Sequence, residues 1–346
     1  MNEQEKYMKR CLELAALGKG NTAPNPMVGS VIVLNDQIIG EGYHRQCGEA
    51  HAEVNAIASV KDQSLLVHAT LYVSLEPCAH YGKTPPCADL IVNKKIPHVV
   101  VGTTDSNKLV AGKGIGKLLQ AGCKVDMGIL EKECREINRR FFTFQEQKRP
   151  YIILKWAQTA DGFIDFRCES TEKAARISNE LSHTLVHKWR SEEQAIMVGT
   201  NTALMDNPQL TTRKWPGKNP IRIVLDRNLR LPASLHLFDQ SVPTLVFNEK
   251  SNQEQANLTY IQIDYNDNPI DSVLNELYIR NIQSVIIEGG AELLNSLIKA
   301  GKWDEARIFT ADKYFNQGVK APVLNAEPDY RDSLGKDLLE VFRNKK

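Results

Sequence analysis

The pattern of apolar and polar positions along the first 130 residues alternates between helical and strand-like spacing. Residues 3–17 carry apolar side chains at helical spacing and end at Gly18, whereas 28–34 and 38–43 are strand-like runs joined by Asn35-Asp36. Later elements are predicted as a helix from about His51, a strand over 71–75, a helix from Cys87, a strand over 97–102, a helix over 114–122 and a strand over 124–127. This alternation predicts a sheet covered by helices, an α/β layered domain.

The second half of the chain repeats this kind of pattern. Residues 151–157 form a buried-strand run, and further strands are predicted over 195–199, 221–226 and 284–288. The last strand leads into Gly289-Gly290 and a helix over 291–300 closed by Gly301. Between the halves, 131–148 reads as the terminal helix of a first domain, and Pro150 follows it. Because 346 residues are too many for one ordinary core, we expect two domains, 1–148 and 149–346.

Composition narrows the class of protein. Apolar residues make up 42% and charged residues 25%, which is typical of a globular protein, and the net charge of +1 disfavours nucleic acid as a main partner. The N-terminal residues lack an apolar signal region and no 18-residue apolar run follows, so we expect neither secretion nor a membrane span. Seven cysteines then indicate free thiols or metal ligands in a cytoplasmic protein.

The most specific chemistry lies in His51-Ala52-Glu53, Pro77-Cys78 and Pro86-Cys87. One imidazole and two thiolates supply three ligands to one Zn²⁺ per chain and leave the fourth tetrahedral position to water. Glu53 is then free to move protons, as in the zinc deaminases, where metal-activated water attacks the amine-bearing carbon of a heterocycle. His51 and Cys87 are each expected at a helix N-terminus, where unpaired backbone N–H groups favour a thiolate. The motif therefore predicts a hydrolytic deaminase.

Several alternatives bear on this hypothesis. Most nucleoside and nucleic-acid deaminases of this type carry Pro-Cys-x-x-Cys, whereas eight residues separate Cys78 from Cys87. A deaminase of free bases, nucleosides or tRNA with a non-catalytic second domain remains open, as does a zinc-stabilised interaction protein with a closed four-ligand site. Cys47 precedes the helix and is interpreted as a bystander. Gly112-Lys113-Gly114-Ile115-Gly116 lacks the third glycine of a dinucleotide loop, so we interpret it as the loop that opens a helix.

Three segments of the first half resemble a known family. Residues 74–89, with 24–29 and 42–44, resemble the bifunctional riboflavin-biosynthesis deaminase–reductases. The resemblance implies a cytidine-deaminase-like α/β/α layered domain over 1–148. It also implies that four residues contact the substrate: Asn25, His44, His80 and Lys83.

The second half resembles the reductase part of the same family, most specifically over 150–165 and 200–213. The resemblance implies a dihydrofolate-reductase-like α/β domain that uses NADPH. The residues implied to contact NADPH are Ala157, Thr202, Asp206, Gly290, Ala291, Glu292, Leu293, Leu294, Asn295 and Ser296. Those implied to contact substrate are Arg190, Leu210, Arg213 and Glu288, with Arg190 or Arg213 holding a 5′-phosphate.

The resemblance thus implies one small-molecule pathway for both halves. The first would deaminate 2,5-diamino-6-ribosylamino-4(3H)-pyrimidinone 5′-phosphate, and the second would reduce the ribosyl side chain to ribityl. One departure concerns 168–176, where Arg176 stands at the position of a family Trp, so a cofactor contact is altered. The sequence leaves open whether the chain forms a homo-oligomer.

Overall fold

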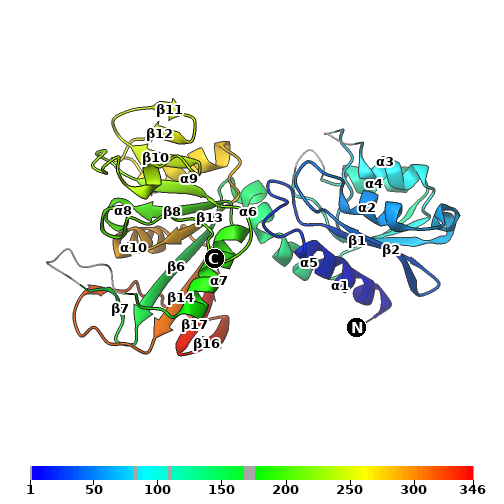
Figure 1. The fold of residues 1–346 in the computed structure, drawn as a ribbon. Coiled ribbons are helices and arrows are strands. Elements are labelled where there is room, and N and C mark those ends of the chain that lie inside the picture. Colours follow the sequence, from blue (N-terminus) through cyan, green and yellow to red (C-terminus); the bar gives the residue numbers. More distant parts are fainter. Residues whose placement is uncertain (1, 82–84, 108–110, 167–175, 346) are drawn as a thin grey trace. The chain divides into compact units, whose positions relative to one another are not determined.

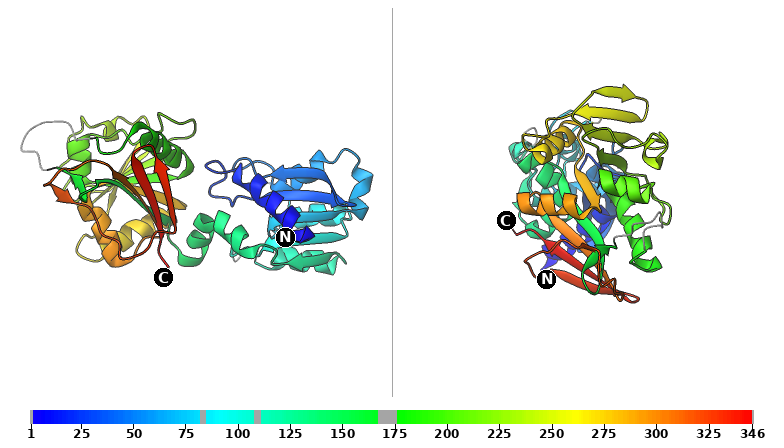
Figure 2. Two further views of the ribbon diagram at one scale, coloured as in Figure 1. Left: turned by 90° about the horizontal axis from the view of Figure 1, so that it is seen from below. Right: turned by 90° about the vertical axis from the view of Figure 1, so that its left-hand side faces the viewer.

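Two separate sheets organise the chain, one in each of the units Met1–Lys148 and Arg149–Lys346 (Figures 1 and 2). The computed structural model describes residues 2–81, 85–107, 111–166 and 176–345. Lys83 and most of the divergent segment 168–176 lie outside the described residues. Both units are α/β, so the predicted fold class is confirmed.

The sheet of the first unit has the order β2-β1-β3-β4-β5. Its strands are β1 (Gly29–Leu34), β2 (Gln37–Tyr43), β3 (Thr70–Leu75), β4 (His98–Thr103) and β5 (Lys124–Met127). The hairpin of β1 and β2 turns at Asn35 and Asp36, which both adopt positive φ, as a two-residue turn requires. β3, β4 and β5 are parallel to one another, so the chain leaves β3 and β4 at the same edge of the sheet.

Helices cover both faces of this sheet. They are α1 (Glu3–Ala16), α2 (Ala52–Ser59), α3 (Cys87–Asn93), α4 (Lys113–Gln120), α5 (Glu131–Ile137) and α6 (Arg139–Gln147), with a short 3₁₀ turn η1 (Gln63–His68). Met8 and Cys11 of α1 pack on one face with Val31, and Ile57 of α2 packs on the other with Ile32. The single helix predicted over 131–148 is wrong, because the helix breaks at Asn138.

The second unit contains a ten-stranded sheet of order β11-β12-β10-β9-β8-β13-β6-β14-β17-β16. The seven strands from β12 to β14 in this order run parallel. The strands are β6 (Tyr151–Thr159), β8 (Ala195–Gly199), β9 (Ile221–Leu225), β10 (Thr244–Asn248), β11 (Gln253–Gln255), β12 (Leu258–Gln262), β13 (Ser284–Glu288), β14 (Glu305–Ala311), β16 (Tyr330–Leu334) and β17 (Asp337–Arg343). A small separate sheet pairs β7 (Phe163–Asp165) with β15 (Val319–Lys320).

Helices also cover both faces of the larger sheet. They are α7 (Glu180–Glu192), α8 (Thr200–Asp206), α9 (Pro269–Ile279) and α10 (Ala291–Ala300), with the 3₁₀ turn η2 (His236–Phe238). Trp189 and Ala203 of α7 and α8 lie in one apolar cluster, and Leu274 and Leu297 of α9 and α10 lie in the other. Within the described part of the chain, no helix is long and apolar enough to cross a membrane.

Candidate active site

Three predicted metal ligands meet at one edge of the first sheet. His51 is the N-cap residue of α2, Cys78 follows the end of β3, and Cys87 is the first residue of α3. His51 Nδ1 lies 3.5 Å from Cys78 Sγ and 3.3 Å from Cys87 Sγ. A tetrahedral zinc ion with bonds of about 2.3 Å to sulfur and about 2.05 Å to nitrogen separates such atoms by about 3.5 Å. The donor set therefore fits zinc, and no fourth His, Cys, Asp or Glu joins this cluster in the part of the chain described.

The two cysteine thiols share a hydrogen bond that shifts their pKa values in opposite directions. The Cys87 thiol donates to Cys78 and lowers the pKa of Cys78 to about 4, although burial opposes the change. The same hydrogen bond, together with burial, raises the pKa of Cys87. The backbone N–H of Cys87 also donates to Cys78 Sγ at 3.3 Å. One thiolate forms readily, and a bound cation would stabilise the second.

Glu53 lies in the first turn of α2, beside this cluster. Its side chain lines the pocket in front of the ligands, although the residue is only 3% exposed. Burial raises the pKa of Glu53 to about 7, and the negative charge of Cys78 acts in the same direction. A carboxyl group with this pKa can both accept and donate a proton near neutral pH.

The pocket has a volume of ≈ 340 Å³, which suits a small molecule. Asn25, His44 and His80, for which the resemblance implied substrate contact, line this pocket, and Asn25 Nδ2 lies 3.1 Å from His44 Nε2. Sequence reasoning missed other lining residues: Glu49, Glu76, Asp105, Asn107, Phe141 and Gln145. Cys47 also lines the pocket but is not part of the ligand cluster.

Glu76 explains how the loop beside the pocket keeps its shape. Its Oε2 accepts hydrogen bonds from the backbone N–H groups of Asp105 (3.3 Å) and Gly112 (3.0 Å), and its Oε1 accepts from Gly114 (3.0 Å) and Ile115 (3.3 Å). The carboxylate thus caps the N-terminus of α4, where negative charge is favourable. A Cβ at Gly114 would lie 1.9 Å from the carbonyl oxygen of Pro77. The glycine-rich segment therefore opens a helix and packs closely, as the sequence predicted.

In the second unit, Glu288 and Arg190 form a nearly buried ion pair. Arg190 Nε and Nη2 donate to the two carboxylate oxygens at 2.9 and 2.8 Å, and Lys155 Nζ lies 3.7 Å from one of them. Burial alone would raise the pKa of Glu288, but the positive charges of Arg190 and Lys155 lower this pKa to about 2. Lys155 was missed at the sequence level, and its signal was a single cation inside the apolar run 151–157.

Two groups of predicted cofactor residues, Thr202 and 290–296, lie just after the ends of β8 and β13. These strands are adjacent and parallel, and α8 and α10 begin directly after them. Gly289 and Gly290 both adopt positive φ, and a Cβ at Gly290 would lie 3.2 Å from Thr202 Oγ1. The first turn of α10, residues 291–293, follows and presents backbone N–H groups that suit a phosphate. The other two predicted cofactor residues are Ala157, which lies on β6, and Asp206, which is the last residue of α8.

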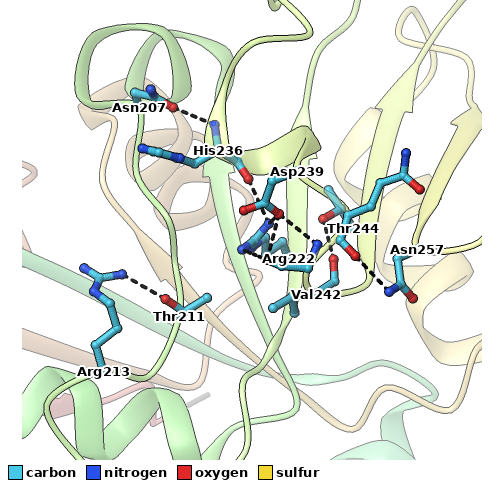
Figure 3. A network of polar contacts seen from close by, with 11 residues as sticks. Asn207, Thr211, Arg213, Arg222, His236, Asp239, Val242, Thr244 and Asn257 are labelled. Carbon is cyan, nitrogen blue, oxygen red and sulfur yellow. Dashed lines mark hydrogen bonds and ion pairs between the residues drawn. The ribbon is translucent and has the colours of Figure 1, made fainter.

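A buried arginine holds a turn that contacts the C-terminal end of α8 (Figure 3). Arg222 on β9 is 1% exposed and donates to the His236 carbonyl oxygen at 2.9 Å, Asp239 Oδ1 at 2.7 Å and Ser241 Oγ at 3.1 Å. The backbone N–H of His236 in turn donates to Asn207 Oδ1 at 2.8 Å. Arg222 thus holds the 236–241 segment, which in turn holds Asn207, the residue from which the segment carrying Leu210 and Arg213 begins.

Arg213 is placed differently from Arg190. Arg213 is exposed, its Nη1 donates to Thr211 Oγ1 at 2.8 Å, and its backbone N–H donates to His187 Nδ1 at 3.0 Å. Leu210 is buried and adopts positive φ. Of the two predicted phosphate ligands, Arg190 is already engaged by Glu288, whereas Arg213 extends toward solvent.

The fold and the ligand cluster together define a zinc-type deaminase unit joined to a dihydrofolate-reductase-like unit. The family described as the cytidine and deoxycytidylate deaminase zinc-binding region matches residues 1–103, and the RibD C-terminal domain matches 150–321. The chain belongs to the RibD family of bifunctional riboflavin-biosynthesis deaminases and reductases.

Full-length relatives support this membership. The riboflavin biosynthesis protein RibD of Aquifex aeolicus is 39% identical over 97% of this chain and 97% of its own length. That of Synechocystis is 40% identical over 93% of this chain and 88% of its own length. The crystal structure of a diaminohydroxyphosphoribosylaminopyrimidine deaminase/5-amino-6-(5-phosphoribosylamino)uracil reductase from Thermotoga maritima covers 99% of this chain and 98% of its own, with a TM-score of 0.88 and 35% identity.

Proposed function

We propose that the first unit removes the 2-amino group of 2,5-diamino-6-ribosylamino-4(3H)-pyrimidinone 5′-phosphate as ammonia. We propose that the second unit then reduces the ribosyl side chain to ribityl with NADPH. The observation that carries the proposal is the three-ligand cluster at the base of a small-molecule pocket, with buried Glu53 beside it.

In the deamination, His51, Cys78 and Cys87 hold the zinc ion. When bound, the ion supplies Lewis acidity that activates water at neutral pH. The Glu53 carboxylate accepts the proton that water loses as it adds to the ring carbon and delivers it to the ring nitrogen. It then carries the proton of the new hydroxyl group to the amine, which leaves as ammonia. Asn25, His44, His80 and Lys83 are proposed to hold the rest of the substrate.

In the reduction, Thr202 and the N-terminus of α10 are proposed to hold phosphate groups of the cofactor. When bound, NADPH supplies the hydride. Ala157, Asp206 and residues 291–296 complete the proposed cofactor site. Backbone N–H groups at a helix N-terminus bind phosphate without a charged side chain, which agrees with the glycines in this turn.

Arg213 is proposed to bind the substrate's 5′-phosphate, with Leu210 beside it. Arg190 is proposed to act through Glu288, since the guanidinium and carboxylate groups already form two hydrogen bonds with each other. Glu288 is then fixed in its charged form near the carboxyl end of β13, where it can accept hydrogen bonds from substrate hydroxyl groups.

The test is incubation of the full-length protein with the diaminopyrimidinone phosphate, with and without NADPH, followed by mass spectrometry. The proposal expects the deaminated ribosyl compound without NADPH and the ribityl compound with it. Ammonia release from a nucleoside or free base alone, with no change in the pyrimidinone phosphate, would contradict the proposal.

A further inference from the structure

Helix α6 forms one wall of the pocket in the first unit. Phe141 and Gln145 both line this pocket, and their spacing of four residues places them on the same face of the helix. None of the site residues that the sequence pointed to lies on α6. The helix is therefore an unassigned part of the substrate site.

Asn138, the residue before α6, joins this wall to a second segment that lines the pocket. The residue is 2% exposed, its Nδ2 donates to the Met27 carbonyl oxygen at 2.8 Å, and its Oδ1 accepts from the Met27 backbone N–H at 2.8 Å. Met27 belongs to the loop that also carries Asn25, which contacts His44. Two hydrogen bonds to one residue fix both the position and the direction of that loop, so α6 and the Asn25 loop keep a constant separation.

The two side chains on α6 lie at different depths. Phe141 is 5% exposed and packs in a cluster with Leu75, the last residue of β3, three residues before Cys78. Phe141 thus packs against the strand whose end leads to the ligand Cys78, and Leu75 lines the same pocket. Gln145 is half-buried and lies about 6 Å farther along the helix axis. Within the described residues, the Gln145 amide makes no hydrogen bond, and it lines the pocket.

These depths match the parts of the proposed substrate. The ring carbon that loses its amine must lie at the metal cluster, so the flat pyrimidinone extends beside Phe141. The ribosyl group is attached to the ring and therefore extends outward, at the level of Gln145. A carboxamide has both donors and an acceptor, and so complements hydroxyl groups, which also donate and accept.

We infer that Gln145 is a substrate-binding residue of the deaminase unit and hydrogen-bonds the ribosyl hydroxyl groups. The inference rests on the proposed deamination and adds a specificity determinant to it. Because the contact is remote from the reacting carbon, it contributes equally to binding of the substrate and of the transition state.

The experiment measures ammonia release by full-length wild type, Gln145→Ala and Gln145→Asn on the ribosylamine 5′-phosphate and on its dephosphorylated form. We expect Gln145→Ala to raise KM about 3- to 10-fold with kcat within about 2-fold, the value of one or two neutral hydrogen bonds. The same factor is expected for both substrates, and Gln145→Asn should show the same defect because it is one methylene shorter. The zinc content should not change.

Glu146→Ala is the matched control, because Glu146 is exposed on the same helix and does not line the pocket. Its KM should equal that of wild type. An unchanged KM in Gln145→Ala would overturn the inference, and so would a defect seen only with the phosphorylated substrate, which would indicate a phosphate contact. If wild type itself released no ammonia, the proposed function would fail and this inference with it.

Discussion

Replacing Glu53 by Gln separates the catalytic role of this carboxyl group from its effect on stability. The amide keeps the size of the side chain but cannot shuttle protons. In the zinc-loaded protein we therefore expect the turnover of deamination to fall by about 10²-fold or more, with zinc retained. NADPH-dependent reduction of the deaminated substrate should be unchanged, because its residues lie in the other unit.

The effect on stability follows from the burial of Glu53. Its pKa rises from the ordinary 4.5 to about 7 in the folded protein, so ionisation of the folded state costs about 3 kcal/mol relative to the unfolded state. Below pH 4.5 the group is protonated in both states and the cost is absent. The cost grows between pH 4.5 and 7 and is constant above pH 7. Metal-free Glu53→Gln should therefore match wild type near pH 4.5 and exceed it by about 3 kcal/mol at pH 8.

The assay is urea unfolding of chelator-treated wild type and Glu53→Gln at pH 5 and pH 8, with ammonia release measured on the zinc-loaded forms. Glu13→Gln is the control, because Glu13 is exposed on α1 and its loss should change neither quantity appreciably. A bound dication should shrink the difference at pH 8, since its charge stabilises the carboxylate. Equal stability of the two metal-free proteins at pH 8 would refute the burial argument. Near-normal ammonia release would refute the catalytic role.

Four further predictions follow from the same structure. Cys78→Ser and Cys87→Ser should each lose zinc and lower the thermal stability of the first unit, and full zinc occupancy by metal analysis would disprove the ligand assignment. Arg190→Met should destabilise the second unit by about 3–5 kcal/mol in chemical unfolding, because Glu288 would remain buried without its main partner. Protonation of Glu288 should lower the free energy of unfolding of wild type by about 3 kcal/mol between pH 4.5 and 2. An equal loss of stability over this pH range in Glu288→Gln would contradict this assignment. Fragments 1–148 and 149–346 should fold separately by circular dichroism, whereas a first fragment that ends before α6 should bind substrate poorly.

Local signals in the sequence predicted most of the parallel core. The strand over 195–199 and the helix over 291–300 coincide with β8 and α10, because a glycine bounds each of them. The hairpin at Asn35 and Asp36 was equally well determined, since few residue pairs adopt positive φ in succession. By contrast, β16 is exposed along most of its length and has no apolar alternation that could have indicated a strand.

The candidate site was predictable only as far as contiguous motifs reached. The residue types of the ligands identify them in the sequence, and the structure brings these ligands together: His51, Cys78 and Cys87. The break at Asn138 could not be predicted, because its amide bonds to Met27, 111 residues away in sequence. The position of Gln145 at the pocket could not be predicted either, because it depends on which face of α6 lines the pocket.

The four hydrogen bonds that converge on Glu76 affect how this loop can change during evolution. Every donor is a backbone N–H group, which any residue except proline supplies, so these hydrogen bonds do not themselves constrain the side chain at position 115. Glu76 has no such freedom, and neither has Gly114, where a Cβ would collide with the Pro77 carbonyl oxygen. Among homologues, we therefore expect Glu76 and Gly114 to vary less than position 115, although all three take part in the same hydrogen-bonded cap of α4.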